Sequence, residues 1–371
     1  MHKLVLQKKL REFLTLISKS QISFNARLIT LMSVVVIASS GCKKEEPPRS
    51  YKVIDTGMWT SVPGGPIKWL DNDRVLFPSN EKLAPAGGPA RMTVWRPATG
   101  QLEFFQPWRS DVCVEDSQVV YGVNDATGKN VTYYRGPVEN PQEYPPPRHN
   151  MYMRKNFSCG WAEKDIRESR ASIPYRIRLR DDNFLEITGE NPNPEPDPQN
   201  LRKSSPVAHT AAYHEREGSN AVPLPLMLSG WDSYYPNYIE WRNAYLIAPD
   251  AYYPGRRIRL WWIERDGRIL EEQLPESLSF PAPGGIAFYP TPNGIFIHYN
   301  GGDLKKVRGG YFLKNDKLEQ LIKANLHGVA LSPDGCRVVF DHAQNPNDYL
   351  SKEKPHRTLK MIDFCIQGGK Q

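Results

Sequence analysis

A recurring strand–turn–strand pattern constrains the fold of this chain more than any other feature of its sequence. Five segments combine an alternating apolar run, a short polar turn and a second apolar run. They begin at Ile67, Val112, Tyr238, Ile286 and Val329, so their starts lie 45, 126, 48 and 43 residues apart. A period of about 40 to 50 residues is typical of repeat architectures in which each repeat forms one small sheet.

Each repeat has the composition of antiparallel strands. The apolar runs alternate with period two and are rich in β-branched and aromatic residues, which indicates half-buried strands. Dipeptides such as Asp334-Gly335 and Asn293-Gly294 indicate tight hairpins. Further strands follow the hairpins, for example in Met92–Phe105 and Thr358–Cys365. We therefore expect an all-β fold, a β-propeller with four-stranded blades over residues 51–371.

The blade count follows from the spacing. The 126-residue interval equals about three units of 42 residues, which leaves room for degenerate blades near Phe157 and near Ala208. We expect about seven blades, with six to eight possible. The last blade lacks an outer strand, and the strand-like segment Tyr51–Trp59 is placed to supply it, so that N-terminal strand pairing with the last blade closes the ring. A pair of β-sandwich domains is the alternative.

The last repeat also carries a family resemblance. Leu331–Ala343, LSPDGCRVVFDHA, followed by Leu359–Phe364, LKMIDF, resembles the Ser-Pro-Asp-Gly propeller repeat. That repeat occurs in the periplasmic propeller of the Tol-Pal system and in the propellers of prolyl oligopeptidases. The resemblance implies a propeller fold for this unit, whereas the earlier units keep the strand pattern without these four residues.

Residues 1–41 have the composition of an export signal peptide. Basic residues precede the uncharged segment Leu28–Ser40, which is too short to span about 30 Å of hydrocarbon. Ser40 and Gly41 before Cys42 resemble the lipobox of bacterial lipoproteins. The resemblance implies lipidation of the Cys42 thiol, so that the chain contacts a membrane through an N-terminal lipid. A soluble secreted protein is the alternative.

The residues after Cys42 fit a lipid-anchored protein. Residues 42–50 are charged and proline-bearing, so we expect an extended tether between the lipid and the folded domain. In the lipoprotein family, Lys43 directly after the cysteine implies sorting to the outer membrane, facing the periplasm. The chain carries a formal net charge of +7, but residues 1–41 hold six Lys/Arg and one Glu, or +5, which leaves +2. A nucleic-acid partner is therefore not expected.

Four cysteines remain after Cys42, an even number that can pair in an oxidising compartment. The strand register places Cys336 opposite Cys365, which predicts a disulfide. Cys113 and Cys159 occupy similar positions in neighbouring units and are expected to bridge two blades. Reduced buried thiols are the alternative for both pairs. None of the four has a CxxC spacing or a neighbouring His, so no metal and no other cofactor is expected.

The sequence offers little support for catalysis. No GxSxG motif surrounds any serine. His209 and His214 lie near Glu215 and Glu217, but two residues five apart on a strand face opposite sides, so a shared metal would require a loop. We expect a protein that is not an enzyme.

Aromatic residues beside arginines are the candidate binding groups. Trp69, Trp95, Trp241 and Trp261 lie on expected strands and should pack between blades. Tyr and Arg on loops form surfaces that bind proteins or stack against sugars. The candidate binding residues, all expected to be exposed, are Tyr234, Tyr235, Tyr252, Tyr253, Arg256 and Arg257.

These features predict a cell-envelope lipoprotein whose propeller is a non-catalytic binding platform for another envelope protein. The alternative is a glycan-acting enzyme or a carbohydrate-binding propeller. A glycosidase would require inward-facing carboxylates about 5 to 9.5 Å apart.

Overall fold

A computed structural model of the chain contains, in its described part, 27 strands and one short 3-10 helix. Among the described residues there is no helix with the length and apolar character needed to cross a membrane. The structure describes residues 51, 53–60, 67–79, 90–109, 112–125, 127, 130–145, 150–153, 159–162, 175–179, 183–190, 208–216, 218–229, 237–249, 251–255, 257–302, 304, 307–343 and 357–365.

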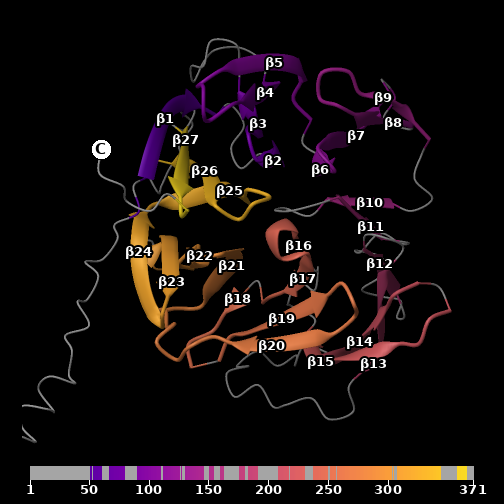
Figure 1. The fold of residues 1–371 in the computed structure, drawn as a ribbon, viewed down its shortest axis with the longest axis vertical. Helices are drawn as coiled ribbons and strands as arrows, with labels where there is room; N and C mark the ends of the chain where they lie inside the picture. The colour runs from indigo at the N-terminus through magenta and orange to yellow at the C-terminus, as the bar shows by residue number, and fades with distance from the viewer. Residues whose placement is uncertain are drawn as a thin grey trace, which may run out of the picture. The chain divides into compact units, whose positions relative to one another are not determined.

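The strands form six antiparallel sheets, which are the blades of a β-propeller (Figure 1). Blade 1 consists of β2 (Lys68–Asp71), β3 (Arg74–Ser79), β4 (Arg91–Trp95) and β5 (Leu102–Pro107). Blade 2 consists of β6 (Cys113–Glu115), β7 (Gln118–Asn124), β8 (Val131–Gly136) and β9 (Gln142–Tyr144). Blade 3 consists of β10 (Asn150–Met153), β11 (Cys159–Ala162), β12 (Tyr175–Arg178), β13 (Phe184–Glu190), β14 (Ala208–His214) and β15 (Val222–Ser229).

The remaining blades contain the second half of the chain and its first strand. Blade 4 consists of β16 (Asn237–Ile239), β17 (Ala244–Ile247), β19 (Arg259–Glu264) and β20 (Ile269–Gln273), with the 3-10 helix η1 (Glu240–Arg242) after β16. Blade 5 consists of β18 (Ala251–Tyr252), β21 (Gly284–Thr291), β22 (Gly294–Tyr299), β23 (Gly309–Lys314) and β24 (Lys317–Lys323). Blade 6 consists of β25 (Asn325–Leu331), β26 (Arg337–Ala343), β27 (Arg357–Asp363) and β1 (Val53–Trp59).

The five predicted hairpins are confirmed, but the predicted count of about seven blades is wrong. Each hairpin supplies two neighbouring strands of one blade, as β2 and β3 do in blade 1. The strands expected to form two degenerate blades, near Phe157 and near Ala208, instead belong to one six-stranded sheet. β14 pairs with β13, and Leu185 lies opposite Tyr213. β14 therefore extends the existing sheet at its edge and does not begin a new sheet.

The predicted pairing of the N-terminal strand with the last blade is confirmed. β1 pairs antiparallel with β27, and Val53 lies opposite Ile362. The hydroxyl of Thr56 donates a hydrogen bond of 2.6 Å to the carbonyl oxygen of Leu359. Blade 6 is therefore built from both ends of the described chain, and β1 covers the edge that β27 would otherwise expose.

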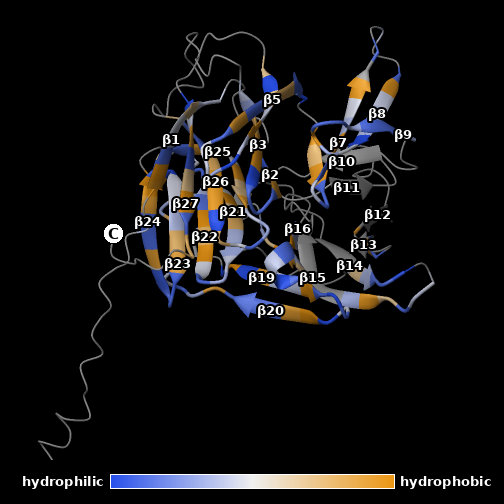
Figure 2. Ribbon diagram, turned by 45° about the horizontal axis from the view of Figure 1, so that its top comes forward, coloured by the Kyte–Doolittle hydropathy of each residue, from blue (hydrophilic) through white to orange (hydrophobic). Residues whose placement is uncertain are grey.

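Central strands such as β3 and β22 bury both of their faces, because their blades pack between two others. Along β22, Ile295 and Ile297 belong to a hydrophobic cluster shared with blade 4, whereas Phe296 belongs to a cluster shared with blade 6. Side chains of neighbouring residues on a strand point to opposite faces. Such strands are apolar along most of their length, as β3 is in Figure 2.

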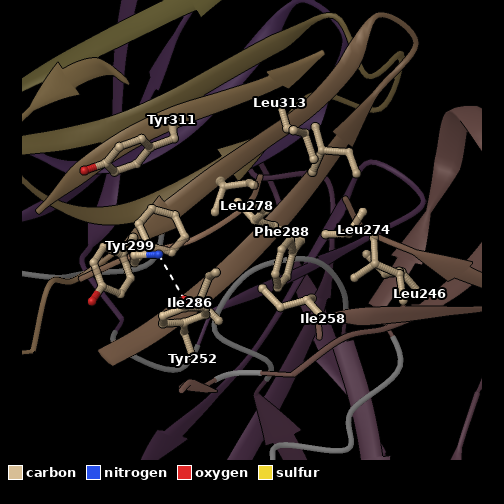
Figure 3. Close-up of a cluster of buried hydrophobic side chains, with 14 of the residues drawn as sticks. Leu246, Tyr252, Ile258, Leu274, Leu278, Ile286, Phe288, Tyr299, Tyr311 and Leu313 are labelled. Atoms are coloured by element: carbon tan, nitrogen blue, oxygen red, sulfur yellow. Dashed lines mark hydrogen bonds between the residues drawn. The ribbon is translucent and has the colours of Figure 1, made fainter. Parts of the chain in front are cut away.

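Hydrophobic clusters join the blades in sequence. Separate clusters lie between blades 2 and 1, 1 and 6, 6 and 5, 5 and 4, and 4 and 3. Figure 3 shows part of the largest one, in which Leu246 of β17 lies near Phe288 of β21. The backbones of β6 and β11 approach each other, but the side chains of β11 lie outside the described ones. Closure of the ring between blades 2 and 3 therefore stays a prediction.

Two cysteine predictions have different outcomes. The predicted Cys336–Cys365 disulfide is present, just beyond the paired residues Arg337 and Asp363 of β26 and β27. Cys113 is also disulfide-bonded. The side chain of Cys159 lies outside the described ones, so its pairing with Cys113 stays a prediction.

Removal of the blade 6 disulfide should lower stability without changing the fold. The two cysteines are 29 residues apart, and a cross-link of that span removes unfolded-chain entropy worth about 3 to 4 kcal/mol. The double substitution Cys336→Ser and Cys365→Ser should reduce the free energy of unfolding by that order in urea titrations. A loss of less than about 1 kcal/mol would contradict the entropic role of the bond.

Candidate functional site

The two ends of the propeller differ in the length of their connections. At one end, which we call the turn end, β2 and β3 are joined by residues 72–73, and β21 and β22 by residues 292–293. At the opposite end, the loop end, β3 and β4 are joined by residues 80–90, and β26 and β27 by residues 344–356. Antiparallel strands alternate in direction, so connections of the two kinds emerge at opposite ends of each blade. Long loops carry binding residues more often than tight turns do.

Polar groups at the turn end bond neighbouring blades to one another. The backbone N–H of Asp334 donates to the side-chain oxygen of Asn72 at 2.9 Å, which joins blade 6 to blade 1. The amide of Asn293 donates to the carbonyl oxygen of Phe364 at 2.9 Å, which joins blade 5 to blade 6. The guanidinium carbon of Arg337 lies 5.1 Å from the ring centre of Trp69. These groups hold the blades together.

The loop end carries buried polar groups of a different kind. Several strands place a polar side chain at this end that is buried almost completely, namely Lys68, Ser79, Asn325, Asp341 and Arg357. Other side chains at the same end contain a buried nitrogen or oxygen atom without a hydrogen-bond partner in the described part of the chain. These atoms are Thr60 Oγ1, Trp108 Nε1, Arg109 Nε, His298 Nε2, Arg308 Nε, His342 Nδ1 and Thr358 Oγ1. Because unsatisfied buried groups are costly, their accumulation marks the loop end as the candidate site.

A buried ion pair lies at the centre of this end of blade 6. The guanidinium of Arg357 lies 3.1 Å from a carboxylate oxygen of Asp341, and both side chains are at most 2% exposed. Arg357 starts β27 opposite Ala343, and Asp341 precedes Ala343 by two residues on β26, which brings Arg357 and Asp341 to the same face. Each charge compensates the other, and loss of either partner would leave a buried charge.

Two histidines at the loop end are held neutral, and one of them, His327, lies opposite Asp341 of this pair. Burial lowers the pKa of His298 to about 4. Burial is also the main reason that the pKa of His327 falls to about 3, and the charges of Arg357 and Arg308 contribute. His327 therefore lies within electrostatic reach of both arginines, and at neutral pH both imidazoles are uncharged.

A β-bulge brings His327 to this position. Leu326 and Val329 are three residues apart, yet both belong to the cluster between blades 5 and 6. In a regular strand, residues three apart face opposite sides. One extra residue is therefore inserted at His327 and Gly328, where the register of β25 against β26 shifts. Gly328 has a φ of 53°, a conformation that glycine adopts without strain. Bulges commonly re-aim a side chain beside a functional site.

The sequence-predicted binding residues do not form one exposed surface. Tyr252 was expected to be exposed, and this is wrong, because it is 2% exposed within the blade 4–blade 5 cluster (Figure 3). Tyr252 lies opposite Gly284 where β18 pairs with β21. The hydroxyl of Tyr252 accepts a hydrogen bond of 3.0 Å from the backbone N–H of Phe280. Tyr253 is half-buried and Arg257 is exposed.

The other predicted residues have mixed outcomes. Cys42, Tyr234, Tyr235 and Arg256 lie outside the described residues. Trp69, Trp95 and Trp261 lie on strands as predicted, whereas the expectation that Trp241 lies on a strand is wrong, because Trp241 lies in the 3-10 helix η1. Trp69, Trp95 and Trp261 are buried, and Trp241 packs against the blade 4–blade 5 cluster.

No metal site emerges in the described part of the chain, where no group of three or more His, Cys, Asp or Glu side chains could hold an ion. The ring of His214 stacks on Phe184, with ring centres 4.5 Å apart. The side chain of His209 lies outside the described ones.

The sequence analysis did not predict the buried polar groups of the loop end, because these groups lie on separate strands. A signal was nevertheless present in the repeats. Phe296-Ile297-His298 and Phe340-Asp341-His342 occupy the same place at the end of the second hairpin strand in neighbouring blades. A histidine that ends an otherwise apolar strand at the same repeat position is a recognisable departure from the pattern.

Comparisons with known proteins give structural likenesses only. No protein-family model matches the chain, and no curated protein does. The β-propeller domain of the Trilobed protease from Pyrococcus furiosus is 8% identical with a TM-score of 0.48, covering 82% of this chain and 93% of that one. Oligogalacturonate lyase from Vibrio parahaemolyticus is 9% identical with a TM-score of 0.41, covering 85% and 94%. TolB from Acinetobacter baumannii is 9% identical with a TM-score of 0.30, covering 78% and 63%. These values are too low to transfer an activity or a partner.

Acidification should destabilise the protein through the buried histidines. An unfolded histidine has a pKa of about 6.5, so below that pH the unfolded chain binds protons that folded His298 binds only near pH 4. The free energy of unfolding should therefore fall as pH drops from about 6.5 towards 4, by at most about 1.4 kcal/mol per pH unit for each such group.

The test compares the wild type with His298→Gln by urea unfolding between pH 6.5 and 5, above the range in which most carboxylates titrate. The variant should show a shallower decline, and His327→Gln should act in the same direction. An unchanged slope in His298→Gln would show that His298 is not buried as a neutral group.

Proposed function

We propose that the chain is a lipoprotein of the bacterial cell envelope whose propeller binds another envelope protein through its loop end. The single observation that carries the binding face is the contrast between the two ends. Turn-end polar groups bond blade to blade, whereas loop-end side chains keep buried donors and acceptors without partners in the described part.

The scaffold suits a platform. Five hydrophobic clusters join neighbouring blades, and such packing holds the described strand ends in constant relative positions. A preorganised binding surface loses less conformational entropy on association than a mobile one. Arg257, on the connection between β17 and β19, offers an exposed cation at this end, and its ion pair with Glu276 is too exposed to be strong.

The proposed location rests on the sequence. The apolar segment Leu28–Ser40, the small residues before Cys42 and the charged tether of residues 42–50 support export, lipidation and a spacer. Lys43 supports an outer-membrane position facing the periplasm.

The glycan-acting enzyme is less well supported. Hydrolysis of a glycosidic bond requires two carboxyl groups in defined roles. Among the described residues, the one buried carboxylate is Asp341, and it is committed to Arg357. Surface carboxylates and the remaining residues keep this alternative open to direct assay.

Lipidation has a direct test in the mass of the mature N-terminus. The protein expressed in a bacterium with its native signal should begin at Cys42, carry a diacylglycerol and partition into the detergent phase of a Triton X-114 extraction. Cys42→Ala should retain residues 1–41 or lose detergent partitioning. A mature N-terminus at any other residue would refute the proposed anchor.

Partner binding is tested by crosslinking in the intact envelope, followed by purification of the protein and identification of what is attached. Arg257→Glu should lower the yield of a specific partner about tenfold, which corresponds to about 1.4 kcal/mol. The matched control is Arg268→Glu, an equally drastic change at a 65% exposed arginine of the turn end. Equal yields from the two variants, or no reproducible partner from the wild type, would refute the loop-end platform.

A further inference from the structure

One face of blade 5 brings an arginine and a histidine together at the loop end. Phe296 packs against blade 6, and His298 shares its face of β22 because the two residues are two apart. His298 lies opposite Gly310 of β23. Arg308 directly precedes β23, and the alternation of that strand, continued by one residue, places Arg308 on the same side as Gly310. His298 and Arg308 are diagonal neighbours on the face of blade 5 that packs against blade 6.

Gly310, which lies opposite His298, has no side chain that could separate His298 from Arg308. A Cβ atom at Gly310 would lie 2.6 Å from Cζ of Phe296 and 3.2 Å from Cδ1 of Leu326 in blade 6. Glycine thus permits blade 6 to approach closely, and it places no side chain between His298 and Arg308.

The hydrogen-bonding capacity of both groups is only partly used. The guanidinium of Arg308 donates one bond of 2.7 Å to the carbonyl oxygen of Gly302. Its Nε atom is buried and has no acceptor in the described part of the chain, and Nε2 of His298 is buried there without a hydrogen-bond partner of either kind. A buried donor without an acceptor costs about 1 to 3 kcal/mol. Two unsatisfied nitrogen atoms at the same end of blade 5 therefore point to a missing partner from outside the chain.

The charges around these two groups leave one positive charge uncompensated. Among the described residues, Arg357 is paired with Asp341, and Lys360 lies 3.2 Å from a carboxylate oxygen of Asp55. Burial holds the pKa values of His298 and His327 near 4 and 3, so both are neutral at pH 7. Arg308 remains without a carboxylate partner among the salt bridges of the described part.

We propose that Arg308 and His298 hold a carboxylate ligand at the loop end, between blades 5 and 6. The guanidinium supplies the compensating charge and an Nε–H donor, and the neutral imidazole supplies a second donor from Nε2. A carboxylate carries one negative charge, which matches the single uncompensated cation, whereas a phosphate monoester carries about −1.5 to −2. The inference goes beyond the proposed platform and does not require a protein partner.

The experiment is a thermal-unfolding titration of the full chain in non-ionic detergent at pH 7. Sodium acetate is the probe, and sodium chloride at the same ionic strength is the reference. Because a ligand that binds the folded state stabilises it by mass action, acetate should raise the unfolding temperature along a saturating curve. Arg308→Gln should weaken the apparent affinity at least tenfold, whereas Arg268→Gln at the turn end should leave it unchanged.

Further arms decide the remaining outcomes. His298→Gln keeps a hydrogen-bond donor and should lower the apparent affinity for acetate less than His298→Phe does. These two variants therefore test the site if Arg308→Gln does not fold. The proposal is overturned if acetate raises the unfolding temperature of the wild type and of both His298 variants equally. It is also overturned if chloride raises the unfolding temperature of the wild type as much as acetate does. If sodium sulfate binds more tightly than acetate and depends equally on Arg308, the assignment to a carboxylate is wrong. Loss of crosslinked partner with acetate binding intact would refute the platform alone.

Discussion

Burial of both faces of the central strands is the constraint on which the rest of the structure depends. A strand such as β22 carries large apolar side chains on each side, so a single blade would expose two apolar faces to water. Each blade therefore requires two neighbours, and the free energy of this burial, about 25 cal/mol per Å² of apolar surface, drives blades together. Blade 6 meets this requirement with strands from both ends of the chain.

Sequence reasoning predicted the local parts of this arrangement well. The hairpins, the strand tryptophans and the Cys336–Cys365 bond follow from alternation, turn residues and register, which are properties of adjacent segments. The blade count failed because alternation identifies a strand without identifying its partner. β14 reads equally well as the first strand of a new sheet or as the next strand of blade 3.

The candidate site was harder to predict for the same reason. Tyr252 lies in a segment that reads as a loop, and only pairing with β21 and the hydrogen bond from Phe280 explain its burial. His298, His327 and Arg308 come from three separate segments, and the bulge at Gly328 that positions His327 has no local signature beyond a glycine. Contacts between blades decide these positions, and a linear pattern does not contain them.

The pairing of β1 with β27 has a consequence for how the chain is made. β1 is the first strand of the described chain to be synthesised and β27 the last, so blade 6 cannot be completed until all the other described strands have emerged. Contacts of such long sequence separation form slowly. A chain truncated by premature termination before Arg357 would leave β1 without a partner and one edge of β26 unpaired, and the cluster that contains Met58 would lose Leu359 and Met361. Truncated chains would thus expose strand edges that proteases recognise. Proteases would therefore degrade truncated chains in preference to complete ones.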